Sequence, residues 1–166
     1  MGAGYHGGFG ATKGSGKSAK TNYIKGNNIN YTREQILSAL DGVTEISSRV
    51  AERIRKGEIL LSVLGDELFD NSFTVKPNTA AFAEDNKIYI RRSSMSLISD
   101  VLHEGVHAND YLHGVPAEEI GGWPGELRAY RAEHEFQIKA GLTIEYANDD
   151  DICVHVWGNY DRRKKK

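Results

Sequence analysis

The sequence predicts an α+β fold in which a small mixed or antiparallel sheet packs on the helix over residues 95–113. Residues 33–56 and 95–113 carry apolar side chains at the 3.6-residue spacing of a helix. Residues 124–140 begin with proline and stop at a glycine, as helices often do. Short apolar runs bounded by turn-forming residues lie among these segments and are typical of strands.

The composition favours one globular core. A chain of 166 residues with 39% hydrophobic content suffices for one core, whereas two domains would each have a thin one. The longest apolar stretch, Ile59 to Leu64, is far shorter than the roughly 18 residues that span a bilayer. A single Cys153 excludes an intramolecular disulfide and a zinc–cysteine site. We expect a soluble domain in which any metal is held by histidine and carboxylate.

Residues 1–30 are predicted to be a flexible linker rich in Gly and Lys, and residues 31–166 to form the domain. The segment ATKGSGKS (11–18) fits a loose phosphate-loop pattern, which works only between a strand and a helix. Residues 1–10 are half glycine, so we predict no strand there. Gly26-Asn27-Asn28 opposes a following helix. We therefore predict no nucleotide site.

Positive charge is concentrated at the two ends of the chain. Residues 1–30 contain four lysines and no acid, and the tail Arg162–Lys166 is basic. The formal charge of the whole chain is −2, which leaves −6 for residues 31–166. Short basic ends are usually solvated, so we expect no nucleic-acid and no membrane partner. A basic-ended binding module that contacts either one is the alternative interpretation.

The first helical segment begins at a capping box, Thr32-Arg33-Glu34-Gln35. Asp41-Gly42 is predicted to split this segment in two, and Gly57 to end it. Residues Glu58–Leu64 are short, apolar and bounded by glycines, which predicts a buried strand.

Residues Ala80–Arg92 indicate a β-hairpin. Asp85-Asn86 is a plausible tight turn. Alternation along a strand then places Ile88 and Ile90 on one face of the sheet and Tyr89 on the other.

Two longer helices follow the hairpin. Ser93 or Ser94 is predicted to cap the first, which runs to Gly114. The second starts at Pro124 and stops at Gly141. The apolar stripe of the first helix comprises Met95, Ile98, Val101, Leu102 and Val106.

A final strand is predicted at residues 152–157. Ile152, Val154 and Val156 alternate there with other residue types. This period of two is the signal of a strand.

The helix over 95–113 contains the pattern H-E-x-x-H, formed by His103, Glu104 and His107. Positions four apart lie one above the other on a helix, so both imidazoles can bind one ion while Glu104 flanks it. A tetrahedral zinc would take both histidines, a third protein ligand and a water whose pKa falls to about 7. Glu104 is placed to accept the water's proton and to pass it to a leaving amine. The motif predicts metal-assisted hydrolysis.

Three residues compete as the third ligand. The metzincin spacing places it at His113, but Asp110 stands where that pattern has glycine, and no Met-turn follows. The gluzincin scheme takes a glutamate from the next helix. Glu126 lies in its first turn, nineteen residues after His107, and Glu133 shares the same face as a substitute. We predict Glu126 as the third ligand.

An oxyanion beside zinc usually needs a second hydrogen-bond donor. Tyr130, Tyr146, His155 and Tyr160 are candidates. We select Tyr130 and His155 as the catalytic candidates beside Glu104.

Residues 58–141 look like a minimal zincin, with strand, hairpin, H-E-x-x-H helix and glutamate helix in that order. AAFAEDNKIYIRRSSMSLISDVLHEGVHANDYLHG followed by ELRAYRAEHEFQ resembles the zincin-like metallopeptidase toxin domains at the C-termini of bacterial polymorphic toxins. The Gly- and Lys-rich stretch YHGGFGATKGSGK is similar to the segment that joins such toxin domains to their delivery proteins.

The resemblance implies a zinc metallopeptidase that hydrolyses peptide bonds in a protein substrate. It implies secretion within a larger polypeptide, action in the cytoplasm of a competing cell, and a cognate immunity protein. It carries His103 and His107 as ligands, Glu104 as general base and Glu126 as third ligand.

The hairpin strand Lys87–Arg92 could pair with an extended substrate backbone, as the resemblance implies. Gly105 departs from the pattern, because zincins commonly have an aliphatic residue there. Glycine inside a helix also costs about 1 kcal/mol relative to alanine.

Overall fold

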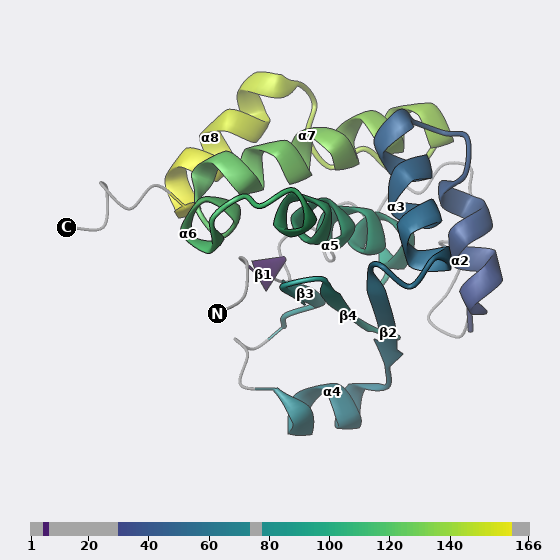
Figure 1. Cartoon of the computed structure of the whole chain (residues 1–166). Coiled ribbons are helices and arrows are strands. Elements are labelled where there is room, and N and C mark those ends of the chain that lie inside the picture. The colour runs from purple at the N-terminus through teal and green to yellow at the C-terminus, as the bar shows by residue number, and fades with distance from the viewer. Residues whose placement is uncertain (1–4, 7–29, 74–77, 161–166) are drawn as a thin grey trace.

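The computed structural model describes residues 5–6, 30–73 and 78–160, which form a mixed α+β fold (Figure 1). The predicted linker, phosphate-loop-like segment and basic tail lie outside the described residues, apart from residues 5, 6 and 30. The elements are β1 (Tyr5–His6), α2 (Arg33–Leu40), α3 (Glu45–Arg55), β2 (Leu60–Leu64), α4 (Asp66–Ser72), β3 (Ala81–Glu84), β4 (Lys87–Arg91), α5 (Leu97–Leu112), α6 (Ala117–Ile120), α7 (Trp123–Ala140) and α8 (Asp149–Tyr160).

The described sheet is mixed and has the strand order β1-β3-β4-β2. Strands β3 and β4 form the predicted antiparallel hairpin, and its turn places Asp85 at a φ of 55°. Strand β2 pairs with β4 in parallel, with Leu60 opposite Lys87. Strand β4 therefore has neighbours on both sides. The expectation that an extended substrate pairs with Lys87–Arg92 is wrong, because its backbone groups already bond within the sheet.

Two expectations about the outer strands are corrected. Residues Tyr5–His6 form β1, antiparallel to β3, although we predicted no strand in residues 1–10. A strand of two residues forms because it pairs with the edge of β3, and it needs no apolar run of its own. Strand β2 confirms the predicted strand at 58–64, but it lies at a sheet edge and is half-buried to exposed. Ile59, just before it, is buried.

The predicted final strand at 152–157 is wrong, because these residues belong to helix α8. Ile152 and Val156 lie one helical turn apart and are buried, whereas Val154 between them is 73% exposed. A period of two over five residues is also compatible with one buried pair four positions apart. The local signal that identifies the helix is a cap residue just before it. The Asn148 side chain accepts a hydrogen bond from the backbone N–H of Asp151 at 3.0 Å, as a helix cap does.

Most predicted helix boundaries are confirmed. Thr32 and Gln35 form the capping box, with hydrogen bonds of 3.1 and 2.9 Å between each backbone N–H and the other's side chain. Gly42 separates α2 from α3 at a φ of 74°. Gly141 ends α7 in the left-handed conformation, at a φ of 72°.

The start of α5 differs from the expectation. The helix begins at Leu97, after Ser96, so neither Ser93 nor Ser94 is its cap residue. The Ser94 hydroxyl instead accepts the Ser96 backbone N–H and bonds to the Asp100 carboxylate. Met95, predicted in the apolar stripe, precedes the helix and is 42% exposed.

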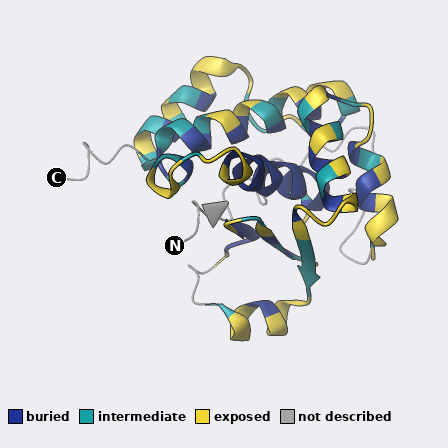
Figure 2. Ribbon diagram, in the orientation of Figure 1, coloured by how far each residue is buried: buried dark blue, intermediate teal, exposed yellow. Residues whose placement is uncertain are grey.

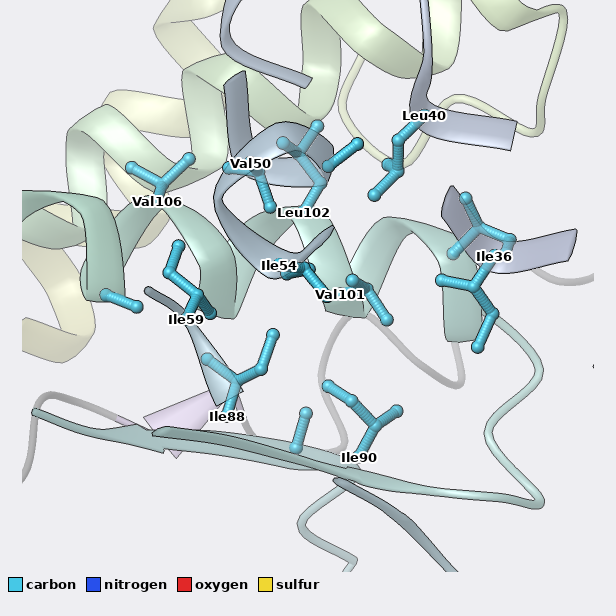
Figure 3. Close-up of a cluster of buried hydrophobic side chains, with 14 of the residues drawn as sticks. Ile36, Leu40, Val50, Ile54, Ile59, Ile88, Ile90, Val101, Leu102 and Val106 are labelled. Carbon is cyan, nitrogen blue, oxygen red and sulfur yellow. The ribbon is translucent and has the colours of Figure 1, made fainter. Parts of the chain in front are cut away.

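Helix α5 is the centre of the fold and is buried along most of its length (Figure 2). The sheet packs on one side of it through Ile88 and Ile90 (Figure 3). Helices α2, α3 and α7 cover other sides. Because every residue from Leu97 to Asp110 is buried, the polar side chains of α5 are inside as well. Buried polar groups are costly unless they are paired, so the neighbours of α5 must supply partners.

A smaller aromatic cluster lies on the other face of the sheet, where α4 covers it (Figure 1). Phe69 of α4, Phe73, Phe82 and Tyr89 contact one another with ring centroids 4.6 to 5.8 Å apart. Tyr89 thus faces away from Ile88 and Ile90, as predicted. The two faces of the sheet therefore have different roles: the aromatic cluster packs on one, and the other packs on α5.

Gly105 departs from the zincin pattern for a packing reason. A Cβ built on Gly105 would lie 2.5 Å from Val50 Cγ1 of α3. Real Cβ atoms essentially never approach so closely, so glycine is what lets α3 contact α5 here. This contact offsets the low helix propensity of glycine.

We predict that Gly105→Ala destabilises the protein by about 1 to 2 kcal/mol, since overpacking outweighs the gain in helix propensity. In a Val50→Ala background the same substitution should be neutral or stabilising. The control is Gly158→Ala in α8, where a Cβ would meet nothing within 4 Å. Urea unfolding measures all four variants. Equal stabilisation by Gly105→Ala and Gly158→Ala would contradict the packing argument.

Candidate metal centre

The polar side chains of α5 meet helix α7, which packs directly on it. Glu126 lies in the first turn of α7, and the preceding backbone fixes where that turn sits. A Cβ on Gly125 would lie 2.2 Å from the carbonyl oxygen of Ile120, so only glycine permits α6 and α7 to approach this closely. The tight α6–α7 junction therefore sets the position of Glu126 relative to α5.

His103, His107 and Glu126 converge on one point in the interior. The three side chains offer ligand atoms that lie within 4.8 Å of one another, and all three residues have 0% exposed surface. Glu126 Oε1 is 3.0 Å from Nε2 of His103 and 3.0 Å from Nε2 of His107. Two ligand atoms bound to one zinc at the tetrahedral angle lie roughly 3.4 Å apart. The spacing is therefore suitable for a metal ion.

The charges at this point also suit a cation. Burial raises the pKa of Glu126, but the two neighbouring imidazoles outweigh it and lower the pKa to about 2, so the carboxylate is ionised. An ionised carboxylate without exposed surface requires positive charge beside it. Its second oxygen, Oε2, and Nδ1 of His107 have no hydrogen-bond partner among the described residues. The donor set of two imidazoles and one carboxylate fits a borderline divalent ion.

Glu133 contacts a ligand rather than joining the ligand set. Its Oε1 lies 3.1 Å from Nδ1 of His103. When Nδ1 donates to this carboxylate, Nε2 keeps the lone pair with which histidine binds a metal. Burial and then the charge of Glu126 raise the pKa of Glu133. A divalent ion beside both acids would offset that repulsion.

His113, the metzincin alternative, lies away from the three converging residues. Helix α5 continues through Asp110 to Leu112, and His113 follows it as the exposed C-cap. Its Nδ1 bonds to the carbonyl oxygen of Asn109 at 2.8 Å. Without a glycine at position 110 the helix does not stop after one turn, so the third imidazole points elsewhere.

A polar network extends behind Glu133. The amide of Gln137 lies 3.4 Å from both Glu133 Oε2 and Ser99 Oγ, and its oxygen accepts the backbone N–H of Glu145 at 3.2 Å. Asp100 is buried nearby, and burial followed by the charge of Glu133 raises its pKa. This network fixes Glu133 and, through it, the ring of His103. The sequence pattern predicts Glu133 only as a substitute ligand, and it carries no signal for Gln137 or Asp100.

The predicted donor residues form an aromatic cluster between α7 and α8. Tyr130 is buried, its ring meets that of His103 edge-on at 4.6 Å, and its hydroxyl lies 3.3 Å from Nε2 of His155. His155 is half-buried and also contacts Tyr146, with ring centroids 5.3 Å apart. Tyr130 therefore supports a ligand ring, while His155 lies one hydrogen bond further from it.

Tyr160, at the end of α8, also lies close to the site. Burial raises its pKa, the charge of Glu126 raises it further, and a hydrogen bond with Tyr130 acts in the opposite direction. The charge of Glu104 contributes as well. The sequence predicts Tyr160 as one of four possible donors, but not as one of the two selected. The helical turn of α8 brings it to the same cluster as His155.

Glu104 lies between the two histidines in sequence and has 0% exposed surface. It does not belong to the three-residue ligand group found among the described residues. Its position on α5 points it about 100° around the helix from His103. The carboxylate is thus held at the same helical turn as the ligands, without competing for the same point.

Comparisons of this chain with protein-family models, curated proteins and solved structures gave no match. No helix in the described part of the chain combines the length and apolarity that crossing a membrane requires.

We predict that His103→Ala, His107→Ala and Glu126→Ala abolish stoichiometric zinc binding, because each removes a ligand atom. Glu133→Gln should retain zinc with an affinity about 10 to 100 times lower, as expected for a residue that orients a ligand. Glu135→Gln, an exposed carboxylate on the same helix, is the matched control and should bind normally. Metal analysis and chelator competition measure both quantities. Loss of zinc from the Glu133 variant alone would show that the third ligand is the other glutamate.

Proposed function

We propose that this protein is a zinc-dependent metallopeptidase of the zincin type. The observation that carries the proposal is the convergence of His103, His107 and Glu126 beside Glu104. Structural zinc sites in proteins have four protein ligands, whereas catalytic sites have three and keep one position open. The group of three residues found among the described residues supports the catalytic kind.

The chemistry needs a nucleophile, a base and a donor. A zinc ion held by these three residues would polarise the scissile carbonyl and lower the pKa of a water that it binds to about 7. Glu104 accepts the proton of the attacking water as its oxygen bonds to the carbonyl carbon. Glu104 then transfers that proton to the amide nitrogen as the carbon–nitrogen bond breaks, releasing a carboxylic acid and an amine. Glu133 keeps His103 in the orientation that the first step needs.

Tyr160 and His155 are the groups that we propose as donors to the developing oxyanion. Both are half-buried, so a substrate oxygen could reach them more readily than the fully buried hydroxyl of Tyr130. Burial raises the pKa of Tyr160, which keeps its phenol protonated and able to donate. We assign Tyr130 the role of holding the His103 ring and the His155 imidazole in place.

We further propose that the domain acts as the toxic part of a larger secreted polypeptide, in the cytoplasm of a competing bacterium. The resemblance of the hairpin, H-E-x-x-H helix and glutamate helix to polymorphic-toxin peptidases supports this proposal. The producing cell would then need an immunity protein that blocks hydrolysis of its own proteins.

A second candidate is a non-catalytic module whose zinc only stabilises the fold. The complete burial of His103, Glu104, His107 and Glu126 favours this alternative, because an inert site needs no access for a substrate. The two functions differ in what Glu104 does. A peptidase needs its carboxylate as a base, whereas a structural site does not.

We predict that Glu104→Gln lowers hydrolysis of unfolded casein by about 10²- to 10⁴-fold while zinc content stays at one per chain. Production of the variant in bacterial cytoplasm should be harmless, whereas the unmodified chain and the control Glu135→Gln should arrest growth. Cleavage of casein is followed by gel electrophoresis and zinc by mass spectrometry. Full activity of the Glu104 variant would favour the structural module.

We predict that Tyr160→Phe lowers kcat by about 10²- to 10³-fold without loss of zinc, because one oxyanion donor is removed. Tyr111→Phe, at an exposed tyrosine of α5, is the control and should leave the rate unchanged. Steady-state kinetics on a labelled peptide substrate separate kcat from KM. A Tyr160 variant with normal kcat would assign the donor to another group.

A further inference from the structure

Arg128 of α7 joins that helix to both α5 and α6. Its Nε–H donates to Oδ2 of Asp110 in α5 at 2.9 Å, and its Nη2 donates to Oε2 of Glu119 in α6 at 3.1 Å. Hydrogen bonds between a guanidinium and a carboxylate are stronger than neutral ones and more demanding of geometry. Helices α5, α6 and α7 contact one another (Figure 1), and one side chain therefore links all three.

The bond to Asp110 lies mostly out of solvent. The side chain of Asp110 is 13% exposed, whereas those of Arg128 and Glu119 are 41% and 43% exposed. Exposed ion pairs contribute little, but a nearly buried carboxylate needs an opposite charge beside it. Arg128 supplies that charge. The Asp110 bond is therefore the stronger half of the Arg128 clamp, the name used here for Arg128 with Asp110 and Glu119.

The Arg128 clamp lies beside the candidate metal centre. Asp110 follows the ligand His107 by three residues on α5, and Arg128 follows the ligand Glu126 by two residues on α7. Side-chain contacts between these two helices surround the centre: Glu133 with His103, Glu126 with both histidines, and Arg128 with Asp110. Helix α7 is thus held to α5 on both sides of His107.

The direction in which Arg128 leaves its helix makes it sensitive to rotation. Two residues correspond to a turn of about 200° around a helix, so Glu126 and Arg128 point in nearly opposite directions. Their exposed fractions of 0% and 41% agree with this geometry. Arg128 therefore reaches Asp110 around the flank of α7. A rotation of α7 that carried Glu126 away from the histidines would also pull the guanidinium out of its hydrogen bonds.

Arg131, the next arginine of α7, has a different partner. It makes two parallel hydrogen bonds of 2.8 Å to the carboxylate of Asp149 at the start of α8. This ion pair joins α7 to α8 and leaves α5 and α6 unattached. The side chains of Arg131 and Arg128 are 49% and 41% exposed. Arg131 is therefore a matched comparison for Arg128, with the same residue type on the same helix.

We propose that Arg128 is a positioning residue of the metal centre. By clamping α5 and α6 to α7 it fixes the Glu126 carboxylate against the two imidazoles, and it thereby raises the affinity of the three ligands for zinc. The proposal rests on the proposed function only for the use that is made of the ion. The described bonds of Arg128 go to Asp110 and Glu119, so it acts on the ligands through these two residues.

The zinc affinity of variants of the complete chain tests the proposal, and the sign of the change is diagnostic. Removing a positive charge close to a bound cation would by itself tighten binding, since like charges repel. We expect the opposite for Arg128→Gln: its zinc dissociation constant, measured by chelator competition, should rise about 10- to 100-fold, as for other residues that orient ligands. Arg131→Gln should bind zinc within about twofold of the unmodified chain. Tighter or unchanged binding by Arg128→Gln, or an equal loss in both variants, would overturn the proposal.

Asp110→Asn reaches the clamp from its other end and serves as well if Arg128→Gln is too unstable to purify. It should also weaken zinc binding, and an unchanged affinity would overturn the proposal. The double variant should bind zinc no more weakly than the weaker single variant, because both substitutions break one contact. A loss in the double variant equal to the product of the two single losses would contradict a shared role.

Cobalt(II) in place of zinc reports on the geometry of the centre. Tetrahedral cobalt absorbs visible light more strongly than octahedral cobalt, so the spectrum follows the placement of the ligands. At saturating cobalt, Arg128→Gln should absorb more weakly than the unmodified chain, and Arg131→Gln should keep the unmodified spectrum. Urea unfolding without metal checks that both variants are folded. Identical spectra of all three folded proteins would overturn the proposal.

Casein hydrolysis by the unmodified chain separates this proposal from the proposed function. If the unmodified chain does not cleave casein, and zinc affinity falls in Arg128→Gln but not in Arg131→Gln, the peptidase is rejected and the positioning role is retained. If the unmodified chain cleaves casein, and both variants bind zinc equally well, the positioning role is rejected and the peptidase is retained.

Discussion

The structure depends on the contact between the Glu126 carboxylate and the imidazoles of His103 and His107. Helix α5 is buried from Leu97 to Asp110, which places polar and charged groups where water cannot solvate them. Such groups are tolerated only when opposite charge or hydrogen bonds compensate them. Glu126 brings the negative charge and the imidazoles bring nitrogen atoms, so the three side chains are positioned to hold a metal ion. The buried polar groups make the helix costly to bury, and the same groups make it able to bind a metal.

The rest of the fold is arranged so that this contact has one geometry. Glycine at position 105 lets α3 press on α5, and glycine at position 125 lets α6 press on α7, so both helices are fixed from outside. Behind the ligands, Glu133 contacts His103, and Gln137 contacts Glu133. Ligands held by packing and by outer hydrogen bonds pay little conformational entropy when an ion binds.

Local sequence patterns predicted local structure well. They did not predict the elements whose structure depends on contacts between distant segments. The capping box at Thr32, the hairpin turn at Asp85 and the final glycine at 141 depend on neighbours within a few residues. Helix α8 was missed because Ile152 and Val156 suit either a strand or one helical turn, and only burial against Tyr130 selects the helix. Strand β1 left no trace in a glycine-rich sequence, because its pairing depends on the free edge of β3.

The sequence by itself determined that His103 and His107 share one face of a helix, since the helical period follows from backbone geometry alone. It also limited the third ligand to a few acids and one histidine. Only the tertiary structure decided among them. Glu126 and Glu133 lie on one face of α7. Which of the two reaches the histidines depends on the rotation of α7 about its axis and on its position along α5. The α6–α7 junction sets both. Packing between helices distant in sequence decides such positions, because no local rule relates the axis of one helix to that of another.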